Sequence, residues 1–227
     1  MLRVLYEDNH IIVVEKPHNI PTQEDETKDK DMLSLVKEHV KEKYNKTGNV
    51  YIGLVHRLDR PTGGVMVFAR TSKAASRLSE QIRNHTLTKT YLTVTVGTPK
   101  ERKYRLTNYL LKNEKTNRVS IVPQLTTGAK EAILDYEVIE SYKKYSLIKV
   151  NLITGRSHQI RVQFKNIGCP VFGDMKYGGE GMVKGYNLAL WCYELKFEHP
   201  TTREKMTFKA YPNEEQIPWK DFKYTSL

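Results

Sequence analysis

The sequence contains only two cysteines in 227 residues, Cys169 and Cys192, and they lie far apart in the chain. Two thiols cannot build the disulfide framework of a small secreted protein or, by themselves, a four-ligand zinc site. Long apolar runs are also missing, so no segment has the ~20 apolar residues that a membrane-spanning helix needs. Residues Met1 to Asp8 lack the basic-then-apolar layout of a secretory signal. These absences predict a protein of the reducing cytoplasm with no membrane partner.

Acidic residues are scarce beside basic ones. The chain has 37 Lys and Arg against 26 Asp and Glu, a formal net charge of +11. A surface of that sign attracts polyanions, and the phosphate backbones of nucleic acids are the commonest polyanions in a cell. The 14 tyrosines add aromatic faces on which bases can stack. Composition therefore favours nucleic acid as the partner over a merely basic surface, and disfavours an anionic membrane, because no helix pairs a basic face with a Trp- or Phe-rich one.

The spacing of apolar residues predicts more strands than helices. Strands are expected at Val4–Tyr6, Ile11–Glu15, Val65–Ala69, Leu87–Val96, Ala132–Val138, Tyr145–Leu152, Leu188–Phe197 and Thr207–Ala210. Helices are expected at Met32–Tyr44, after a cap at Thr71-Ser72, and after a cap at Ser157, the last one ending at Gly168. Because few strands alternate with helices, the expected fold class is α+β with a mixed, mainly antiparallel sheet.

Four stretches are expected to be irregular. Thr22–Asp31 is charged and lacks an apolar period, which predicts a surface loop. Lys100–Thr127 is polar and basic, with brief strand signals at Leu110-Leu111 and Val119–Val122. The glycines from Gly173 to Gly181 predict loops, and residues 211–227 form a polar tail that is expected on the surface.

One segment stands out chemically: His56-Arg57-Leu58-Asp59-Arg60-Pro61-Thr62-Gly63-Gly64. A single carboxylate, Asp59, lies between two guanidinium groups, ahead of a predicted buried strand. Opposite charges nearby favour the ionised carboxylate. Such a pair can also be purely structural and only pin a loop, so this segment alone leaves both interpretations open.

Three separated segments, taken in order, resemble the RluA-type pseudouridine synthases. They are His56 to Thr62, Lys89-Thr90-Tyr91, and Gly155-Arg156-Ser157-His158-Gln159-Ile160-Arg161-Val162. The opening Tyr6-Glu7-Asp8 and Val13 to Pro17, and the late Leu195 to Pro200, fit as well. The resemblance implies a catalytic domain over residues 1–227, as one body or as two sheet lobes, with flanking helices, a central cleft and no S4-type RNA-binding domain before it.

The same resemblance implies roles for three chemical residues. Asp59 is expected to be the catalytic carboxylate that attacks or deprotonates the target uridine, after which the uracil rotates and rejoins through its C5. Tyr91 is expected to stack on the flipped base and to assist proton removal from C5. Arg161 is expected to hold Asp59. A packed strand tyrosine and a solvated helix arginine are the ordinary alternatives for the last two.

Five further residues are implied to bind the substrate: Arg57, Arg60, Leu190, His56 and Arg156. Arg57 resembles the residue that enters the RNA stack where the base leaves, because a planar guanidinium can fill that gap. Leu190 is expected against the base, with an ordinary core leucine as the alternative. Gly63, Gln163 and Trp191-Cys192 depart from the usual pattern of the family, which affects expected substrate contacts more than the chemistry.

The predicted function is therefore the isomerisation of uridines in ribosomal RNA, transfer RNA or both, by a monomer that needs no cofactor, nucleotide or metal. His56, His158 and His199 are too dispersed to suggest a metal site. An RNA-binding protein of the same fold without catalysis is the alternative. A carboxylate-dependent hydrolase is less favoured, because a second acid, Asp135 or Asp174, could reach Asp59 only through the fold.

Overall fold

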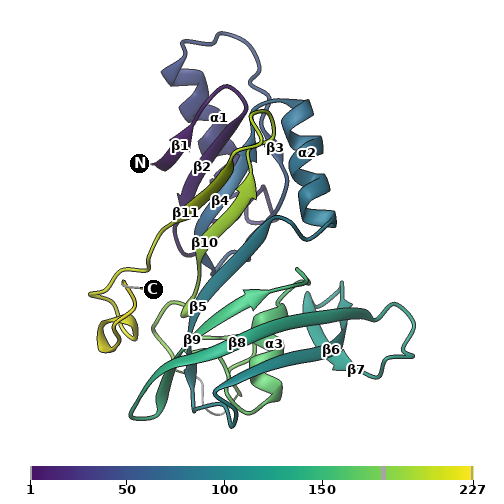
Figure 1. Ribbon diagram of the computed structural model, residues 1–227, viewed down its shortest axis with the longest axis vertical. Helices are drawn as coiled ribbons and strands as arrows, with labels where there is room; N and C mark the ends of the chain where they lie inside the picture. Colours follow the sequence, from purple (N-terminus) through teal and green to yellow (C-terminus); the bar gives the residue numbers. More distant parts are fainter. Residues whose placement is uncertain (1, 180–182, 226) are drawn as a thin grey trace. The chain divides into compact units, whose positions relative to one another are not determined.

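The computed structural model describes residues 2–179, 183–225 and 227. The chain divides into two compact units, and each is described by itself (Figure 1). Unit 1 comprises Met1–Lys89 and Cys192–Ala210, and unit 2 comprises Thr90–Trp191 and Tyr211–Leu227. Gly181, which was expected in a loop, lies outside the described residues.

Unit 1 is built on an antiparallel core of strands. Its order of hydrogen-bonded neighbours is β1-β2-β4-β10, with β3 paired to β4 and β11 paired to β10. The β1/β2, β2/β4, β3/β4 and β10/β11 pairs are all antiparallel. The bounds are β1 Arg3–Glu7, β2 Ile11–Lys16, β3 Gly53–Leu54, β4 Gly63–Ala69, β10 Leu190–Glu198 and β11 Lys205–Lys209.

Two capped helices complete unit 1, α1 (Met32–Lys43) and α2 (Ser72–Arg83). The side chain of Asp31 accepts a hydrogen bond from the Ser34 N–H at the start of α1, and Thr71 caps α2 as the sequence predicts. The apolar face of α2 packs with residues of β2, β4 and β10 in one buried cluster that includes Ile11, Val13, Val65, Val67, Leu78 and Leu195.

Unit 2 carries a second run of neighbouring strands in the order β5-β9-β8-β6-β7. Their bounds are β5 Thr88–Val96, β6 Lys103–Asn113, β7 Arg118–Val122, β8 Lys130–Tyr142 and β9 Tyr145–Leu152. The predicted hairpin of β8 and β9 is confirmed. In the polar stretch Lys100–Thr127, the strand signals at Leu110-Leu111 and Val119–Val122 are confirmed within β6 and β7. Strand β6 is longer than its signal, with 11 residues, because pairing with β8 holds its polar sequence from Lys103 to Leu110.

Helix α3 (Gln159–Asn166) and the short 3₁₀ helix η2 (Trp219–Asp221) complete unit 2. Ser157 does not cap α3; the cap position belongs to His158, whose backbone has a left-handed φ of 52° and whose side chain makes no capping bond. Gly168, with φ of 76°, follows the helix as predicted. The prediction of a surface tail was also wrong in part, because Trp219, Phe222 and Tyr224 are buried.

The predicted class, α+β with a mixed and mainly antiparallel sheet, is confirmed. Cys169 and Cys192 are both buried, and neither forms a disulfide. Within the described ranges, none of the helices is long and apolar enough to cross a membrane. The central cleft stays a prediction.

Candidate active site

The turn that carries Asp59 joins β3 to β4 in unit 1, and its backbone is tied down at several points. The Thr62 N–H donates to the carbonyl oxygen of Asp59 at 2.9 Å. The Thr22 hydroxyl donates to the Leu58 carbonyl at 2.8 Å and accepts from the Leu58 N–H at 3.3 Å. Leu58 and Thr62 are buried on either side of the half-buried Asp59. Its carboxylate therefore projects from a backbone that is fixed before and after it.

The buried ammonium of Lys16 holds the same turn from the end of β2. Its Nζ donates to the carbonyl oxygens of Pro17 at 3.1 Å, Arg60 at 2.9 Å and Thr62 at 2.6 Å. Burial lowers the pKa of Lys16 to about 7, while the charge of Asp59 raises it and that of Arg60 lowers it. Three carbonyl acceptors match the three N–H donors of the charged form. Lys16 was missed as a site residue, and its only signal is a lysine that ends an otherwise apolar strand just before Pro17.

Arg57 and Arg60 flank Asp59 in sequence but have different surroundings. Arg57 is exposed. The guanidinium of Arg60 donates to the Asn19 carbonyl at 3.2 Å and the Thr27 hydroxyl at 2.9 Å, and it forms ion pairs with Asp25 and Asp29. Arg60 therefore fastens the predicted surface loop Thr22–Asp31 to the turn.

His56 lies at the base of the turn and is buried. Its Nε2 accepts a hydrogen bond from the Val67 N–H of β4 at 3.1 Å. Burial, and then the charge of Lys89, lowers the pKa of His56 to about 3. The imidazole is therefore neutral near pH 7, with its proton on Nδ1, and it positions the backbone.

Glycine is required where the turn enters β4. Gly64 has a φ of +122°, and a Cβ there would lie 2.2 Å from the carbonyl oxygen of Cys192 on β10. Cys192, one of the departures from the family pattern, therefore contacts the Asp59 turn through its backbone at Gly64. Gly63, the other departure in this segment, begins β4 and is buried.

Arg161 is on α3 in unit 2, where it forms a buried bidentate pair with Asp174. Its Nε donates to Oδ2 of Asp174 at 2.8 Å and its Nη2 donates to Oδ1 at 2.7 Å. The two residues are only 5% and 1% exposed. Burial disfavours the charge of Asp174, yet the hydrogen bonds and charge of Arg161, with the Tyr177 and Lys176 N–H groups, lower its pKa overall. Asp174 uses one edge of the guanidinium, which has five N–H donors in all.

Tyr177 contacts both members of this pair. The ring centroid of Tyr177 lies 5.1 Å from Cζ of Arg161. Its hydroxyl accepts from the Val119 N–H at 2.9 Å and lies 2.7 Å from Nδ1 of His158. Its own N–H donates to Asp174 at 3.0 Å. The tyrosine therefore ties Arg161 to strand β7 and to the start of α3.

Asp174 was considered only as a distant second acid, and Tyr177 was not singled out. The available signal was the turn Gly173-Asp174, in which Gly173 has φ of +73° and no space for a Cβ beside the Asn187 carbonyl. Gln163, another departure from the expected pattern, donates to the carbonyl oxygens of Leu106 and Ala132 and so fixes α3 to the sheet.

The remaining predicted residues belong to unit 2. Tyr91 on β5 and Leu190 at the start of β10 are 5% and 4% exposed. Arg156 is exposed, and its Nε donates to the Glu131 carbonyl at 2.8 Å. The structure thus brings His56, Arg57, Asp59 and Arg60 together in unit 1, and Arg156 and Arg161 around the start of α3 in unit 2. The pairing of Asp59 with Arg161 stays a prediction.

The described residues offer no group of three or more His, Cys, Asp or Glu side chains placed to hold a metal ion.

Residues 10–166 match the sequence profile of a family described as RNA pseudouridylate synthase. The matched range contains Asp59, Tyr91 and Arg161. Among similar sequences, an RNA pseudouridine synthase of Aquifex aeolicus, described as uncharacterized, is 34% identical over 223 residues, covering 92% of this chain and 68% of its own length. Ribosomal large subunit pseudouridine synthase D of Vibrio parahaemolyticus is 32% identical, with 92% of this chain and 66% of that protein covered. The chain thus spans about two thirds of the length of these relatives.

Two solved human structures share the fold. RNA Pseudouridylate Synthase Domain Containing 4 superimposes with a TM-score of 0.79 at 21% identity, covering 94% of this chain and 89% of that chain. RNA Pseudouridylate Synthase Domain Containing 1 gives a TM-score of 0.74 at 22% identity, covering 96% and 86%. At these identities the likeness concerns the fold.

Proposed function

Since the chain belongs to the RNA pseudouridylate synthase family, whose substrate is RNA, we propose that it isomerises specific uridines to pseudouridine with Asp59 as the catalytic carboxylate. One observation carries this proposal: the family match of residues 10–166 includes Asp59 in a turn that Lys16, Thr22 and His56 hold from three directions. Such a turn presents the carboxylate in one place, which a positioned nucleophile or base requires.

The reaction exchanges one bond of the uridine for another. The bond from N1 to C1′ breaks, a bond from C5 to C1′ forms, the proton on C5 leaves and N1 gains a proton. Asp59 serves either as the nucleophile at the sugar or base, or as the base that removes a ribose proton. Both routes need an ionised carboxylate and neither changes an oxidation state, so no cofactor is required.

The other residues supply positioning. Tyr91 stacks on the flipped base and assists proton removal from C5, Leu190 packs against the base, and the buried Arg161 holds Asp59. Exposed Arg57 fills the space that the base leaves in the RNA stack. Arg60 and His56 act through the turn rather than on RNA, because their hydrogen bonds go to the loop and to β4.

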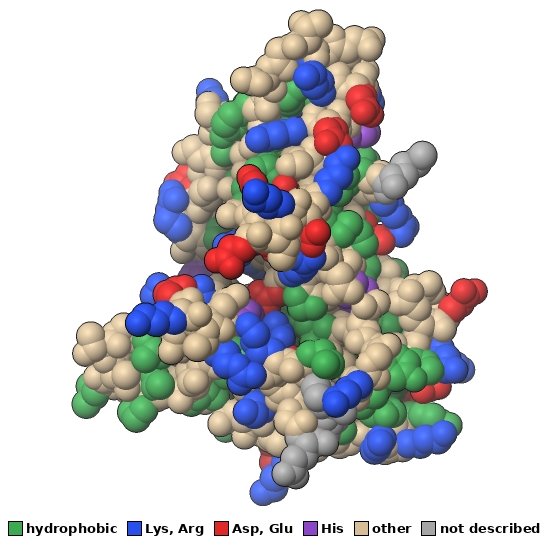
Figure 2. Space-filling model, turned by 180° about the vertical axis from the view of Figure 1, so that it is seen from behind, with side chains coloured by type: hydrophobic (Ala, Val, Ile, Leu, Met, Phe, Trp, Pro, Cys, Tyr) green, Lys and Arg blue, Asp and Glu red, His purple; other side chains and the backbone are tan. Residues whose placement is uncertain are grey.

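Ribosomal RNA is the first substrate to test, because the Vibrio relative is named for the large ribosomal subunit. Transfer RNA is the second. The cationic surface fits either polyanion: Figure 2 shows blue Lys and Arg side chains spread over the face it presents. A cytoplasmic monomer remains the expected form.

The proposal is tested on unmodified transcripts of large-subunit ribosomal RNA and of transfer RNAs. After incubation, carbodiimide adducts that survive alkali mark each pseudouridine as a stop in reverse transcription. Wild type should create stops at one or a few uridines, and Asp59→Ala should create none while binding the same RNA. Stops with both proteins would remove Asp59 from the chemistry. Binding with no stops for wild type on any RNA would instead indicate a non-catalytic RNA-binding protein.

A further inference from the structure

A cavity of about 350 Å³ lies in unit 2, and neither Arg161 nor Asp174 lines it. Three segments line it: the β6/β7 hairpin, the turn at Gly128 before β8, and Gly155 to Ser157 before α3. Its apolar floor includes Leu110 and Val119, each 4% exposed and part of a core cluster with Val162 and Tyr177. The cavity is thus an opening onto a firm sheet surface.

The rim of this cavity is cationic. Lys112, Lys130 and Arg156 line it against a single carboxylate, Glu114, which pairs with Lys112. Among the described residues, the ammonium of Lys130 and the two terminal nitrogens of Arg156 have no protein acceptor. A rim with this excess of unpaired donors favours an anion.

The guanidinium of Arg156 is held in one orientation. Its Nε donates to the Glu131 carbonyl at 2.8 Å, and the backbone N–H of Arg156 donates to Oε1 of Gln159 at 3.0 Å. Gln159 in turn donates to the Ile133 carbonyl at 3.0 Å, and Thr154 donates to Gln159 at 2.8 Å. The segment before α3 is therefore fastened to β8, so Arg156 loses little freedom when its terminal nitrogens bind a phosphate.

We propose that this cavity binds one nucleotide of the RNA outside the uridine that reacts, with its phosphate on Arg156 and Lys130 and its base or sugar on Leu110 and Val119. The volume suits a nucleotide, since a phosphate alone would fill only part of it. Because neither Arg161 nor Asp174 lines the cavity, we assign it a role in binding RNA and none in the reaction. This inference rests on the proposed function, and it places an RNA contact five residues before Arg161 in the sequence.

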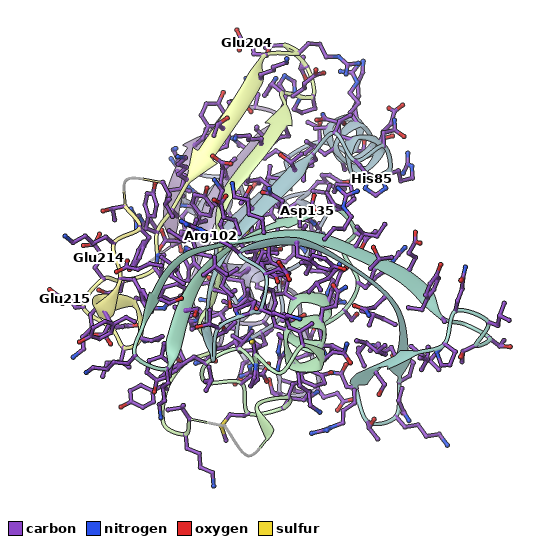
Figure 3. The ribbon with its side chains drawn as sticks, turned by 60° about the horizontal axis from the view of Figure 1, so that its bottom comes forward. His85, Arg102, Asp135, Glu204, Glu214 and Glu215 are labelled. Carbon is purple, nitrogen blue, oxygen red and sulfur yellow. The ribbon has the colours of Figure 1, made fainter. Side chains whose placement is uncertain are left out.

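The 11-residue strand β6 offers matched controls at its other end, where Lys103 is seven residues, or roughly 23 Å of strand, from Leu110 at the cavity. Arg102, labelled in Figure 3, is an exposed arginine just before β6. Lys103 and Glu137 form an exposed ion pair there, which parallels the pair of Lys112 and Glu114.

The test measures binding of a fluorescein-labelled uridine decamer by anisotropy at several salt concentrations. Arg156→Gln and Lys130→Gln should each raise Kd roughly fivefold and reduce the slope of log K against log salt by about 0.7 per lost phosphate contact. Glu114→Gln should lower Kd roughly twofold or more, because it removes the competing carboxylate. Arg102→Gln and Glu137→Gln should leave Kd nearly unchanged. Equal effects at both ends of β6 would overturn the proposal in favour of a diffuse cationic surface.

A second measurement locates the ligand on the folded wild-type protein. Titration of ¹⁵N-labelled protein with uridine 5′-monophosphate should shift the amide signals of Gly128, Gly155 and Ser157. No shift at these amides up to millimolar nucleotide would overturn the proposal. Neither readout depends on pseudouridine formation, so a protein that binds here but never isomerises uridine would contradict the proposed function and leave this inference standing.

Discussion

At the scale of single residues, the buried pair of Arg161 and Asp174 is expected to contribute strongly to the free energy of unfolding. Both residues are almost inaccessible, and each satisfies the other's charge through two hydrogen bonds. A substitution that neutralises one partner leaves the other as a buried charge without compensation. Substitutions that neutralise both partners leave two polar, uncharged groups of similar shape.

The predicted effect of Asp174→Asn is a loss of about 3–5 kcal/mol in the free energy of unfolding. Arg161→Gln should cost a similar amount, and the double variant Arg161→Gln/Asp174→Asn should recover much of the loss. Urea unfolding of the four proteins measures this. If the double variant loses the sum of the two single losses, the pair does not act as a unit.

His56 makes stability depend on acid. Its pKa is about 3 in the folded chain against an ordinary value of 6.5, so between these values the unfolded chain binds a proton that the folded chain does not. Unfolding free energy should therefore fall as pH drops through this range, by about 1.4 kcal/mol per pH unit from this group.

The variant His56→Gln removes that contribution while keeping an acceptor for the Val67 N–H. Its deficit in stability relative to wild type should shrink as pH falls from 7 to 4, in guanidinium unfolding at each pH. Parallel stability profiles for the two proteins would show that His56 is not the group responsible.

At the scale of elements, Lys16 joins the end of β2 to the Asp59 turn. Three carbonyl oxygens, those of Pro17, Arg60 and Thr62, accept hydrogen bonds from its Nζ. Because methionine has a similar length but no donors, Lys16→Met should loosen the turn without emptying its space.

For Lys16→Met we expect at least tenfold lower kcat, with faster amide exchange confined to the turn, measured by hydrogen exchange and mass spectrometry.

The pH dependence of the free energy of unfolding also has a defined sign. Since the folded pKa is about 7 against 10.5, wild type should gain stability relative to the variant as pH rises from 7 to 10. A variant with wild-type exchange and kcat would remove Lys16 from the site.

The elements differ in how far sequence predicted them. Strands β2 and β4 and helices α1 and α2 were predicted because apolar residues and caps are local signals. Strand β6 was predicted only at Leu110-Leu111, since only Leu106 and Leu110 of its residues are buried and pairing with β8 and β7 holds the rest. The cap of α3 and the buried aromatic residues of the tail depend on contacts that no local pattern records.

The residues of the candidate site also differ in whether a local sequence pattern predicts them. Asp59 and Arg161 are proposed as site residues because each stands in a motif that resembles a known family. Their supports, Lys16 and Asp174, lie 43 and 13 residues away in the chain. Hydrogen bonds between such distant residues are a product of the fold, and so sequence analysis alone did not identify them.

For the whole molecule, the excess of basic residues and the family match agree on RNA as the substrate. Charge explains attraction to RNA but not chemistry, because phosphate contacts are largely indifferent to sequence. We propose that the carboxylate of Asp59 supplies the chemistry that binding alone cannot.

Release of tritium from C5 of uridine, in labelled RNA that lacks the modification, measures this role of Asp59. Asp25, an exposed carboxylate that pairs with Arg60 in the same unit, provides the matched control. Wild type and Asp25→Asn should release tritium at rates within a few fold of each other, while Asp59→Asn, which differs from wild type only by an amide at Asp59, should be slower by 10⁴-fold or more. Release by Asp59→Asn at a rate near that of wild type would show that Asp59 is not the catalytic carboxylate.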